Sequence, residues 1–237
     1  MSFSRVHCSL TGARQPIARA TAERIFRIAA TDDFHAAVTA RLLAPMQREA
    51  PGCRLAMTTP GRDRLERLLL DGDIDLVLGI SFVMPPDAVC ETLYLDDFLC
   101  VARHDHPAFG DPAFGRALDL DTYCRLPHLL VSPLTGDFTG HVDDELSALD
   151  RRRRVVASVG SFLLVPEVLA RTDLVCTVAG RLARLWQGRL AIAEPPLEVA
   201  GFAVQLGWSP AADADQGLAW LRGRLRSLCA EPSGGAP

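Results

Sequence analysis

Short apolar runs alternate with stretches of helical periodicity along most of this chain. The clearest run is Ile25–Ala30, which is too short for a helix and is bounded by polar residues, so it predicts a buried β-strand. The polar residues Thr31–Asp33 then supply helix N-cap side chains, and a helical pattern opens at Phe34. We expect this helix to cover residues 34–50, with Pro45 kinking or restarting it.

The same alternation continues through the first half of the chain. A β-α-β-α-β order with short connections predicts a parallel sheet with right-handed crossovers. After the strand and helix above, the expected elements are a strand at 54–59, a helix at 62–70, a strand at 74–80 and two further strands at 88–95 and 97–102. The last of these strands is expected to leave the first lobe.

A second series of elements follows Arg103. The expected helices cover 118–123, 140–149, 162–170 and 180–186, and the expected strands cover 128–131, 154–159, 174–178 and 190–192. A strand at 202–208 is suited to return the chain to the first lobe, and a helix at 215–229 closes it. The pattern therefore predicts an α/β fold of two Rossmann-like lobes with two crossovers between them.

The division into lobes follows from this order of elements. The first lobe is expected to be parallel-stranded and to comprise residues 23–101 plus 201–230, and the second to comprise residues 102–200. Residues 1–22 show no clear periodicity and stay unassigned, and residues 231–237 are expected to form a flexible tail.

The end of the first strand is the first candidate for a binding site. A strand that ends in a capped helix start directs free backbone N–H groups, and the positive end of the helix dipole, at one spot. In an open α/β sheet, ligands bind at this edge. We therefore expect residues 31–34 to form one wall of a small-molecule pocket.

Composition and charge narrow the function classes. Of 237 residues, 49% are hydrophobic and 23% charged, which is typical of a globular chain with a sizeable core, and no apolar run is long enough to span a bilayer. The first twenty residues lack a secretion signal, and seven scattered cysteines without a CxxC pair fit a reducing cytoplasm. The net charge of -4 argues against binding nucleic acid unaided.

Catalytic and metal-binding motifs are absent from the sequence. We find no GxSxG, P-loop, GxGxxG or HExxH pattern, so we expect neither an enzyme nor a bound cofactor. His104 and His106 form an H-x-H pair without a third ligand at suitable spacing, so no metal is expected. Residues 143–145 suit helix capping, and the basic run 151–154 is typical of a solvated helix end.

Several segments, taken in order, resemble a known family. They are FRIAATDDF, the Leu-Ala-Pro step at 43–45, Glu-Ala-Pro at 49–51, LLLDGDIDLVLG at 68–79, RHDHPAF at 103–109, HVDDELSALDRRRRV at 141–155 and SFLLVPEVLARTDLVCTV at 161–178. Together they resemble the effector-binding domain of LysR-type transcriptional regulators, nearest to the branch with nodulation and aromatic-degradation regulators. The resemblance covers about residues 23–230. It departs from the family at Ala179, where proline is usual, and at Arg152 or Arg153, where glycine is common.

The resemblance implies a fold like that of type 2 periplasmic binding proteins, with an aromatic or acidic small-molecule effector bound between the lobes. It implies a homodimer or homo-oligomer in which the helix at 34–50 packs against the second lobe of its mate. The family binds DNA through a winged helix-turn-helix, which residues 1–22 are too short to encode. We therefore expect no sequence-selective DNA binding by this chain itself, no membrane partner and a cytoplasmic location.

The same resemblance places candidate effector-binding residues at the ends of several elements. In the first lobe they are Thr31, Asp32, Thr59, Ser81 and Phe82, and in the second lobe they are Phe138, Thr139, Ser161 and Phe162. Helix capping alone accounts for Thr31 and Asp32, with the pocket role favoured for Thr31 and the cap for Asp32. A plain turn accounts equally well for Thr59, and each aromatic side chain could simply belong to the core.

Two other functions are compatible with this fold. One is a two-lobed solute-binding protein of an importer, which the lack of a secretion signal disfavours. The other is a stand-alone dimerisation module that acts on full-length regulators.

Overall fold

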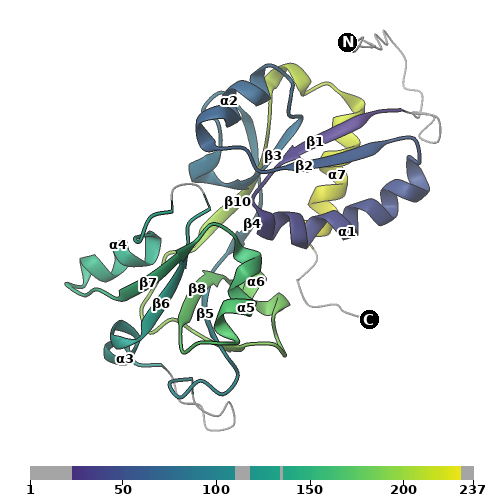
Figure 1. Ribbon diagram of the computed structural model, residues 1–237. Helices are drawn as coiled ribbons and strands as arrows, with labels where there is room; N and C mark the ends of the chain where they lie inside the picture. The colour runs from purple at the N-terminus through teal and green to yellow at the C-terminus, as the bar shows by residue number, and fades with distance from the viewer. Residues whose placement is uncertain (1–22, 110–117, 134–135, 231–237) are drawn as a thin grey trace.

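The computed structural model describes residues 23–109, 118–133 and 136–230 and contains two five-stranded sheets (Figure 1). The segments that the sequence left unassigned or assigned to a tail, 1–22 and 231–237, lie outside the described residues. In the first sheet the strand order is β2 (Arg54–Thr58), β1 (Ile25–Ala29), β3 (Leu76–Ile80), β10 (Phe202–Trp208) and β4 (Val89–Asp96).

The first sheet is mixed, not parallel. β1 pairs in parallel with β2 and β3, as predicted, but β10 runs antiparallel to both of its neighbours, β3 and β4. The register places Phe202, where β10 begins, opposite Asp96, where β4 ends. The prediction of a parallel-stranded lobe was therefore wrong for β10. The chain enters β10 beside the point where it leaves β4, so β10 has to run in the opposite direction.

The second sheet has the order β7 (Arg154–Val159), β6 (Pro127–Val131), β8 (Val175–Ala179), β5 (Phe98–Ala102) and β9 (Ala191–Ala193). β6 is parallel to β7 and β8, whereas β5 is antiparallel to β8 and β9. The chain thus changes sheet at Asp97 and returns before Phe202, so the prediction of two crossovers is confirmed. The lobe limits at 101 and 201 remain a prediction, although the whole of β5 pairs within the second sheet.

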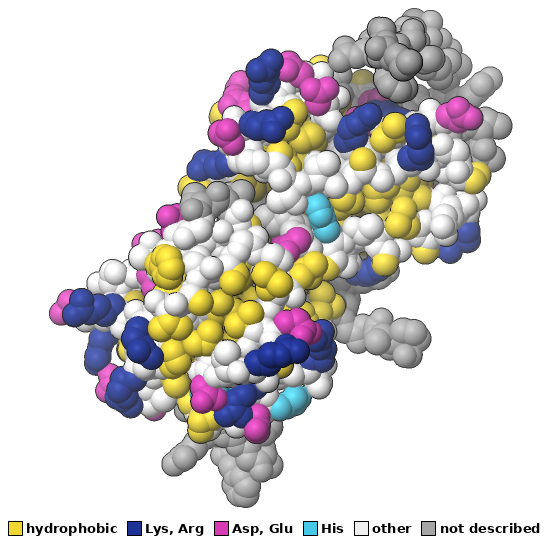
Figure 2. Space-filling model, viewed as in Figure 1, with side chains coloured by type: hydrophobic (Ala, Val, Ile, Leu, Met, Phe, Trp, Pro, Cys, Tyr) yellow, Lys and Arg dark blue, Asp and Glu magenta, His cyan; other side chains and the backbone are white. Residues whose placement is uncertain are grey.

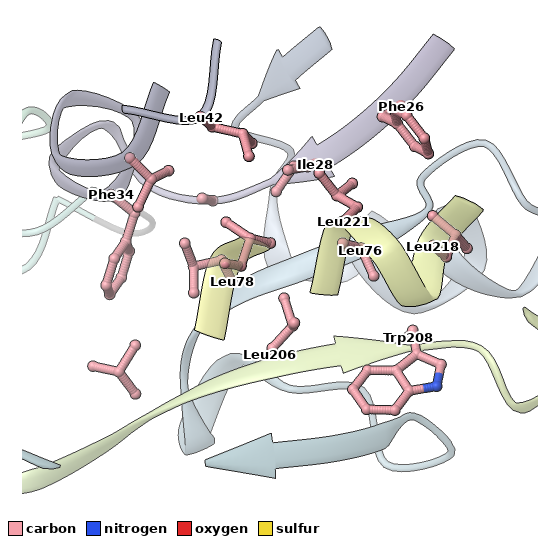
Figure 3. Close-up of a cluster of buried hydrophobic side chains, with 14 of the residues drawn as sticks. Phe26, Ile28, Phe34, Leu42, Leu76, Leu78, Leu206, Trp208, Leu218 and Leu221 are labelled. Atoms are coloured by element: carbon pink, nitrogen blue, oxygen red, sulfur yellow. The ribbon is translucent and has the colours of Figure 1, made fainter. Parts of the chain in front are cut away.

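Helices cover both faces of the first sheet. α1 (Asp32–Glu49) and α7 (Gln216–Ala230) pack on one face around a large cluster of buried side chains, and α2 (Arg62–Leu70) packs on the other. In Figure 3, side chains from β1, β3, β10, α1 and α7 point toward one another in that large cluster. α1 runs through Pro45 without a break because Val38, Leu42 and Met46 anchor the same face on both sides of it.

Shorter helices surround the second sheet. They are α3 (Leu120–Arg125), α4 (His141–Ala148), α5 (Val165–Leu169) and α6 (Gly180–Leu185), together with the 3₁₀ turn η4 (Phe162–Leu164). The 3₁₀ turns η2 (Ser81–Val83) and η5 (Pro210–Ala212) follow β3 and β10 of the first sheet. The helix expected over 162–170 is divided into η4 and α5. Proline suits the first turn of a helix, where no N–H partner is needed, so α5 starts just before Pro166.

Candidate ligand-binding cavity

A cavity of about 700 Å³ lies between the two sheets and takes its walls from both. Its first-lobe wall includes the turn after β1, the end of β3 and the start of β10, and its second-lobe wall includes the start of α4, the end of β8 and the start of α6. Six aromatic side chains line it: Phe34, Phe82, Tyr94, Phe98, Phe162 and Phe202. An apolar cavity of this size with a few polar groups suits a small ring-bearing molecule.

The turn between β1 and α1 lies in this cavity, as the sequence indicated. Thr31 is the N-cap of α1 in an extended conformation, yet its side chain makes no capping bond. Instead its hydroxyl donates to a carboxylate oxygen of Asp33, and both residues line the cavity. Thr31 therefore faces the cavity, but its hydroxyl proton is already engaged in the hydrogen bond to Asp33.

Asp33 also lines this wall of the cavity, although it is not among the binding residues predicted from the sequence. It is 9% exposed, and burial raises the pKa of its carboxyl to about 6, against the lowering effect of the hydrogen bond from Thr31. Both aspartates of the Thr-Asp-Asp sequence suit a helix start equally well. Which of them points into the cavity depends on contacts with other parts of the fold, so the sequence alone carried no signal for Asp33.

Asp32 has a different position from the one expected. It is the first residue of α1, not its cap, and it does not line the cavity. Its carboxylate accepts a hydrogen bond from the hydroxyl of Ser161 and another, at 3.2 Å, from the backbone N–H of Phe162. Asp32 and Ser161 thus join the two lobes across the cleft, while Phe162 itself contributes to the lining.

The remaining first-lobe candidates lie at the mouth of the cavity. Thr59 lines it, and its hydroxyl donates to the carbonyl of Ala30 at 2.8 Å. Ser81 and Phe82 belong to η2 and also line it. The guanidinium of Arg62 lies 3.9 Å from the centre of the exposed Phe82 ring, a cation–π contact at the rim.

Phe138 and Thr139 are not brought to the cavity. Phe138 is 56% exposed, Thr139 is also exposed, and neither lines the cavity. The lining at this point comes from Gly140, His141 and Val142, because α4 begins at His141 and turns its first residues inward. The loop named by the family resemblance thus reaches the cavity through Gly140 and His141, and not through Phe138 or Thr139.

The second-lobe wall contains a buried ion pair. Arg153 donates to both carboxylate oxygens of Asp143 at 2.9 and 2.8 Å, and to the hydroxyl of Tyr123 at 3.2 Å. The Tyr123 hydroxyl lies 2.8 Å from that of Thr177, and both Arg153 and Thr177 line the cavity. The interpretation of 151–154 as a solvated run was therefore wrong for Arg153, whose charge Asp143 balances inside the lobe.

Asp143 also fulfils the capping role expected of residues 143–145, since it accepts the backbone N–H of Gly140 at 2.8 Å. One side chain thus starts α4 and neutralises Arg153. The other arginines of the run, 151, 152 and 154, are exposed.

Where the two crossovers meet, a third group of polar side chains lines the cavity. The guanidinium of Arg181 lies 3.6 Å from the centre of the Tyr94 ring and donates to the Cys229 carbonyl at 2.7 Å. The backbone N–H of Arg181 donates to Asp96 at 3.1 Å, and burial raises the pKa of that carboxyl. No sequence motif marked these residues, because they come from β4, α6 and α7.

Within the described ranges, no group of three His, Cys, Asp or Glu side chains is arranged to hold a metal ion. No helix among the described residues is both long and apolar enough to cross a bilayer. The six cysteines of the described ranges form no disulfide with one another.

The family model "LysR substrate binding domain" matches residues 19–230. The HTH-type transcriptional regulator SyrM of Rhizobium etli is 34% identical over 197 residues, which are 82% of this chain and 56% of SyrM. The HTH-type transcriptional activator NahR of Pseudomonas putida is 28% identical over 204 residues, 85% of this chain and 66% of NahR. The chain thus spans between about half and two thirds of the length of these relatives.

Solved structures agree with the family match. The crystal structure of the regulatory domain of MexT, a transcriptional activator in Pseudomonas aeruginosa, superposes with a TM-score of 0.74 and 31% identity, over 88% of this chain and 100% of that one. The two mixed sheets and their two crossovers are those of LysR regulatory domains, whose fold resembles type 2 periplasmic binding proteins. The chain belongs to the LysR substrate-binding domain family.

Proposed function

We propose that this chain senses a small ring-bearing effector in the cavity between its lobes and passes the signal on to transcription. The cavity of about 700 Å³ carries this proposal, because both lobes supply its walls and aromatic side chains dominate them. An effector that touches both walls binds the closed arrangement of the lobes better than the open one. It shifts the equilibrium between them by that difference in affinity alone.

The route from effector to DNA is part of the same proposal. SyrM and NahR are named as helix-turn-helix regulators, and this chain matches 56% and 66% of their lengths. The formal net charge is -4, which disfavours strong contact with phosphates by this region itself. DNA recognition then comes from a helix-turn-helix outside the matched residues, the protein works in the cytoplasm, and it catalyses no reaction.

A calorimetric titration tests the effector site. Wild-type protein is titrated with a panel of aromatic acids, alcohols and amines, beside Ala203→Phe, which places a ring in the cavity lining. Ala211→Phe is the matched control, since Ala211 is an exposed residue of η5 outside the lining. We expect binding by wild type and Ala211→Phe, and none by a folded Ala203→Phe. Equal binding by all three proteins would contradict the proposed site.

We also propose that two copies associate through α1 of one and the second lobe of the other. Large apolar side chains are exposed on both surfaces: Leu43 on α1 is 38% exposed, and Leu185 on α6 is 50% exposed. Figure 2 shows hydrophobic side chains gathered on the visible face of the second lobe. In a symmetric dimer each copy contributes both surfaces, so the same contact forms twice.

Light scattering at tens of micromolar tests the dimer. Wild type is expected to have the mass of a dimer or larger oligomer, and Leu43→Glu to shift it toward the monomer. Leu70→Glu, at an exposed leucine of α2, is the control and should leave the mass unchanged. A strictly monomeric wild type would contradict the proposed dimer.

A further inference from the structure

Asp33 gives the first-lobe wall of the cavity a particular chemistry. It is the second residue of α1, it is almost fully buried, and its side chain lines the cavity. The neighbouring Thr31 hydroxyl donates to it, so that proton is not available to a ligand. The two side chains therefore offer oxygen lone pairs, which accept hydrogen bonds, and no free hydroxyl proton.

Within the described ranges, no Arg or His forms an ion pair with the Asp33 carboxyl. The titratable or charged groups on the elements around it are Asp32 and Arg41 on α1, Tyr94 and Asp96 on β4, Arg181 on α6 and Cys229 on α7. The guanidinium of Arg181 is engaged by the Tyr94 ring and the Cys229 carbonyl, and the charge of Arg41 acts on the Cys229 thiol.

A buried acid without a cation favours some ligands over others. A ligand that brings a hydroxyl or an amine N–H to Asp33 replaces lost water with a charge-assisted hydrogen bond. A ligand carboxylate at the same place sets two like charges side by side, which disfavours ionisation of one or both.

We propose that Asp33 selects effectors that present a hydrogen-bond donor, a hydroxyl or an amine, to the turn after β1, and rejects those that place a carboxylate there. This inference rests on the proposed function, because it concerns the chemistry of the same cavity. It narrows the expectation of an aromatic or acidic effector, because it places no carboxylate of the effector at this turn.

Three probes of nearly equal size test the selection. Benzylamine, benzyl alcohol and benzoate are titrated at pH 7 into wild type, Asp33→Asn and Asp87→Asn, with binding followed by NMR shifts of the cavity amides. Asn keeps the shape of Asp33 and removes its charge. Asp87 is an exposed acid of the first lobe outside the lining, so its variant controls for net charge.

The expected result is a reversal of preference confined to one variant. Wild type and Asp87→Asn should bind benzylamine and benzyl alcohol more tightly than benzoate, by about ten-fold or more for the amine. Asp33→Asn should lose most of that preference. Benzoate binding as tight as benzylamine in wild type, or an unchanged ratio in Asp33→Asn, would overturn the inference and leave the proposed function standing.

A pH series on wild type gives a second measurement that needs no variant. Since the pKa of Asp33 is about 6, lowering the pH from 7 to 5 should weaken benzylamine binding by about ten-fold. Asp33→Asn keeps every other side chain of the cavity lining, so the variant shows how much of the effect is due to Asp33. A pH-independent affinity in wild type contradicts the inference. If none of the probes shifts the cavity amides, both the proposed function and the inference fail.

Discussion

Two buried charges in the cavity lining, Arg153 of the second lobe and Asp33 of the first, are balanced in opposite ways. Arg153 is enclosed with its counterion Asp143, and the hydroxyl of Tyr123 accepts a further N–H. Asp33 accepts a hydrogen bond from the Thr31 hydroxyl and forms no ion pair with any described residue. A buried charge with its partner in the same lobe holds that lobe together, whereas a buried charge without one is available to a ligand.

Breaking the second-lobe pair should have the largest effect. Arg153→Met leaves the Asp143 carboxylate buried without its partner, so the free energy of unfolding should fall by about 3–5 kcal/mol. Arg152→Met, at an exposed neighbour, should stay within about 0.5 kcal/mol of wild type. Urea denaturation measures both. Equal losses for the two variants would show that Arg153 is as solvated as its neighbour.

Replacing Asp33 by asparagine removes the buried charge of the first lobe and should raise the free energy of unfolding. The pKa of Asp33 is raised by burial to about 6, so the folded protein holds this proton more tightly than the unfolded chain. Ionised Asp33 therefore lowers stability as the pH rises from about 4 to 6. Asp33→Asn should stabilise the protein by about 3 kcal/mol at pH 7 and by less than about 1 kcal/mol at pH 4.

Thermal melts of Asp33→Asn across that pH range measure the gain. Asp87→Asn serves again as the exposed control, with an expected change within about 0.5 kcal/mol. A stability gain that is the same at pH 4 and pH 7 would mean that the Asp33 carboxyl titrates like a solvated one.

His128 gives the second lobe a pH dependence of the opposite sign. Its ring donates to the Tyr123 carbonyl at 2.8 Å, and burial lowers its pKa to about 4. The unfolded chain then binds this proton more tightly, so stability falls as the pH drops below about 6.5. The loss by pH 5 should reach about 2 kcal/mol. NMR of the labelled imidazole checks this, and a titration midpoint above pH 6 would be inconsistent with it.

The smallest effect is expected at Thr31. Thr31→Val keeps the shape of the side chain and removes the hydroxyl that donates to Asp33. Stability should fall by about 1 kcal/mol, and the pKa of Asp33 should rise further, since that hydrogen bond favours the ionised form. Melts at pH 5 and pH 7 on wild type and Thr31→Val test both parts. An unchanged stability at both values would show that the bond contributes nothing.

The sequence predicted elements better than it predicted which side chains face the cavity. The strands at 154–159 and 202–208 have the predicted bounds, because each is a short, mostly apolar stretch between loop residues. The direction of β10 could not be read, since periodicity along one strand says nothing about which neighbours it joins. The direction of β10 is set by the path that the chain takes from the second lobe back to the first.

Side-chain direction is harder because it depends on contacts between distant segments. Thr31 could be placed at the cavity from its position after β1, but the choice between Asp32 and Asp33 depends on Ser161 of the other lobe, which binds Asp32. Arg153 looked like its exposed neighbours until Asp143, ten residues earlier, was brought beside it. In both cases the deciding partner lies on a different element.

The insertion of β10 between β3 and β4 also constrains how the protein folds during synthesis. β4 pairs with β10 in the first sheet, yet roughly 110 residues separate the end of β4 from the end of β10. At about 5–20 residues per second, the ribosome needs on the order of ten seconds to supply that strand. All strands of the second sheet are made in that interval, so we expect the second lobe to fold first. The first sheet then waits, with β3 and β4 as exposed edges, for the strand that joins them.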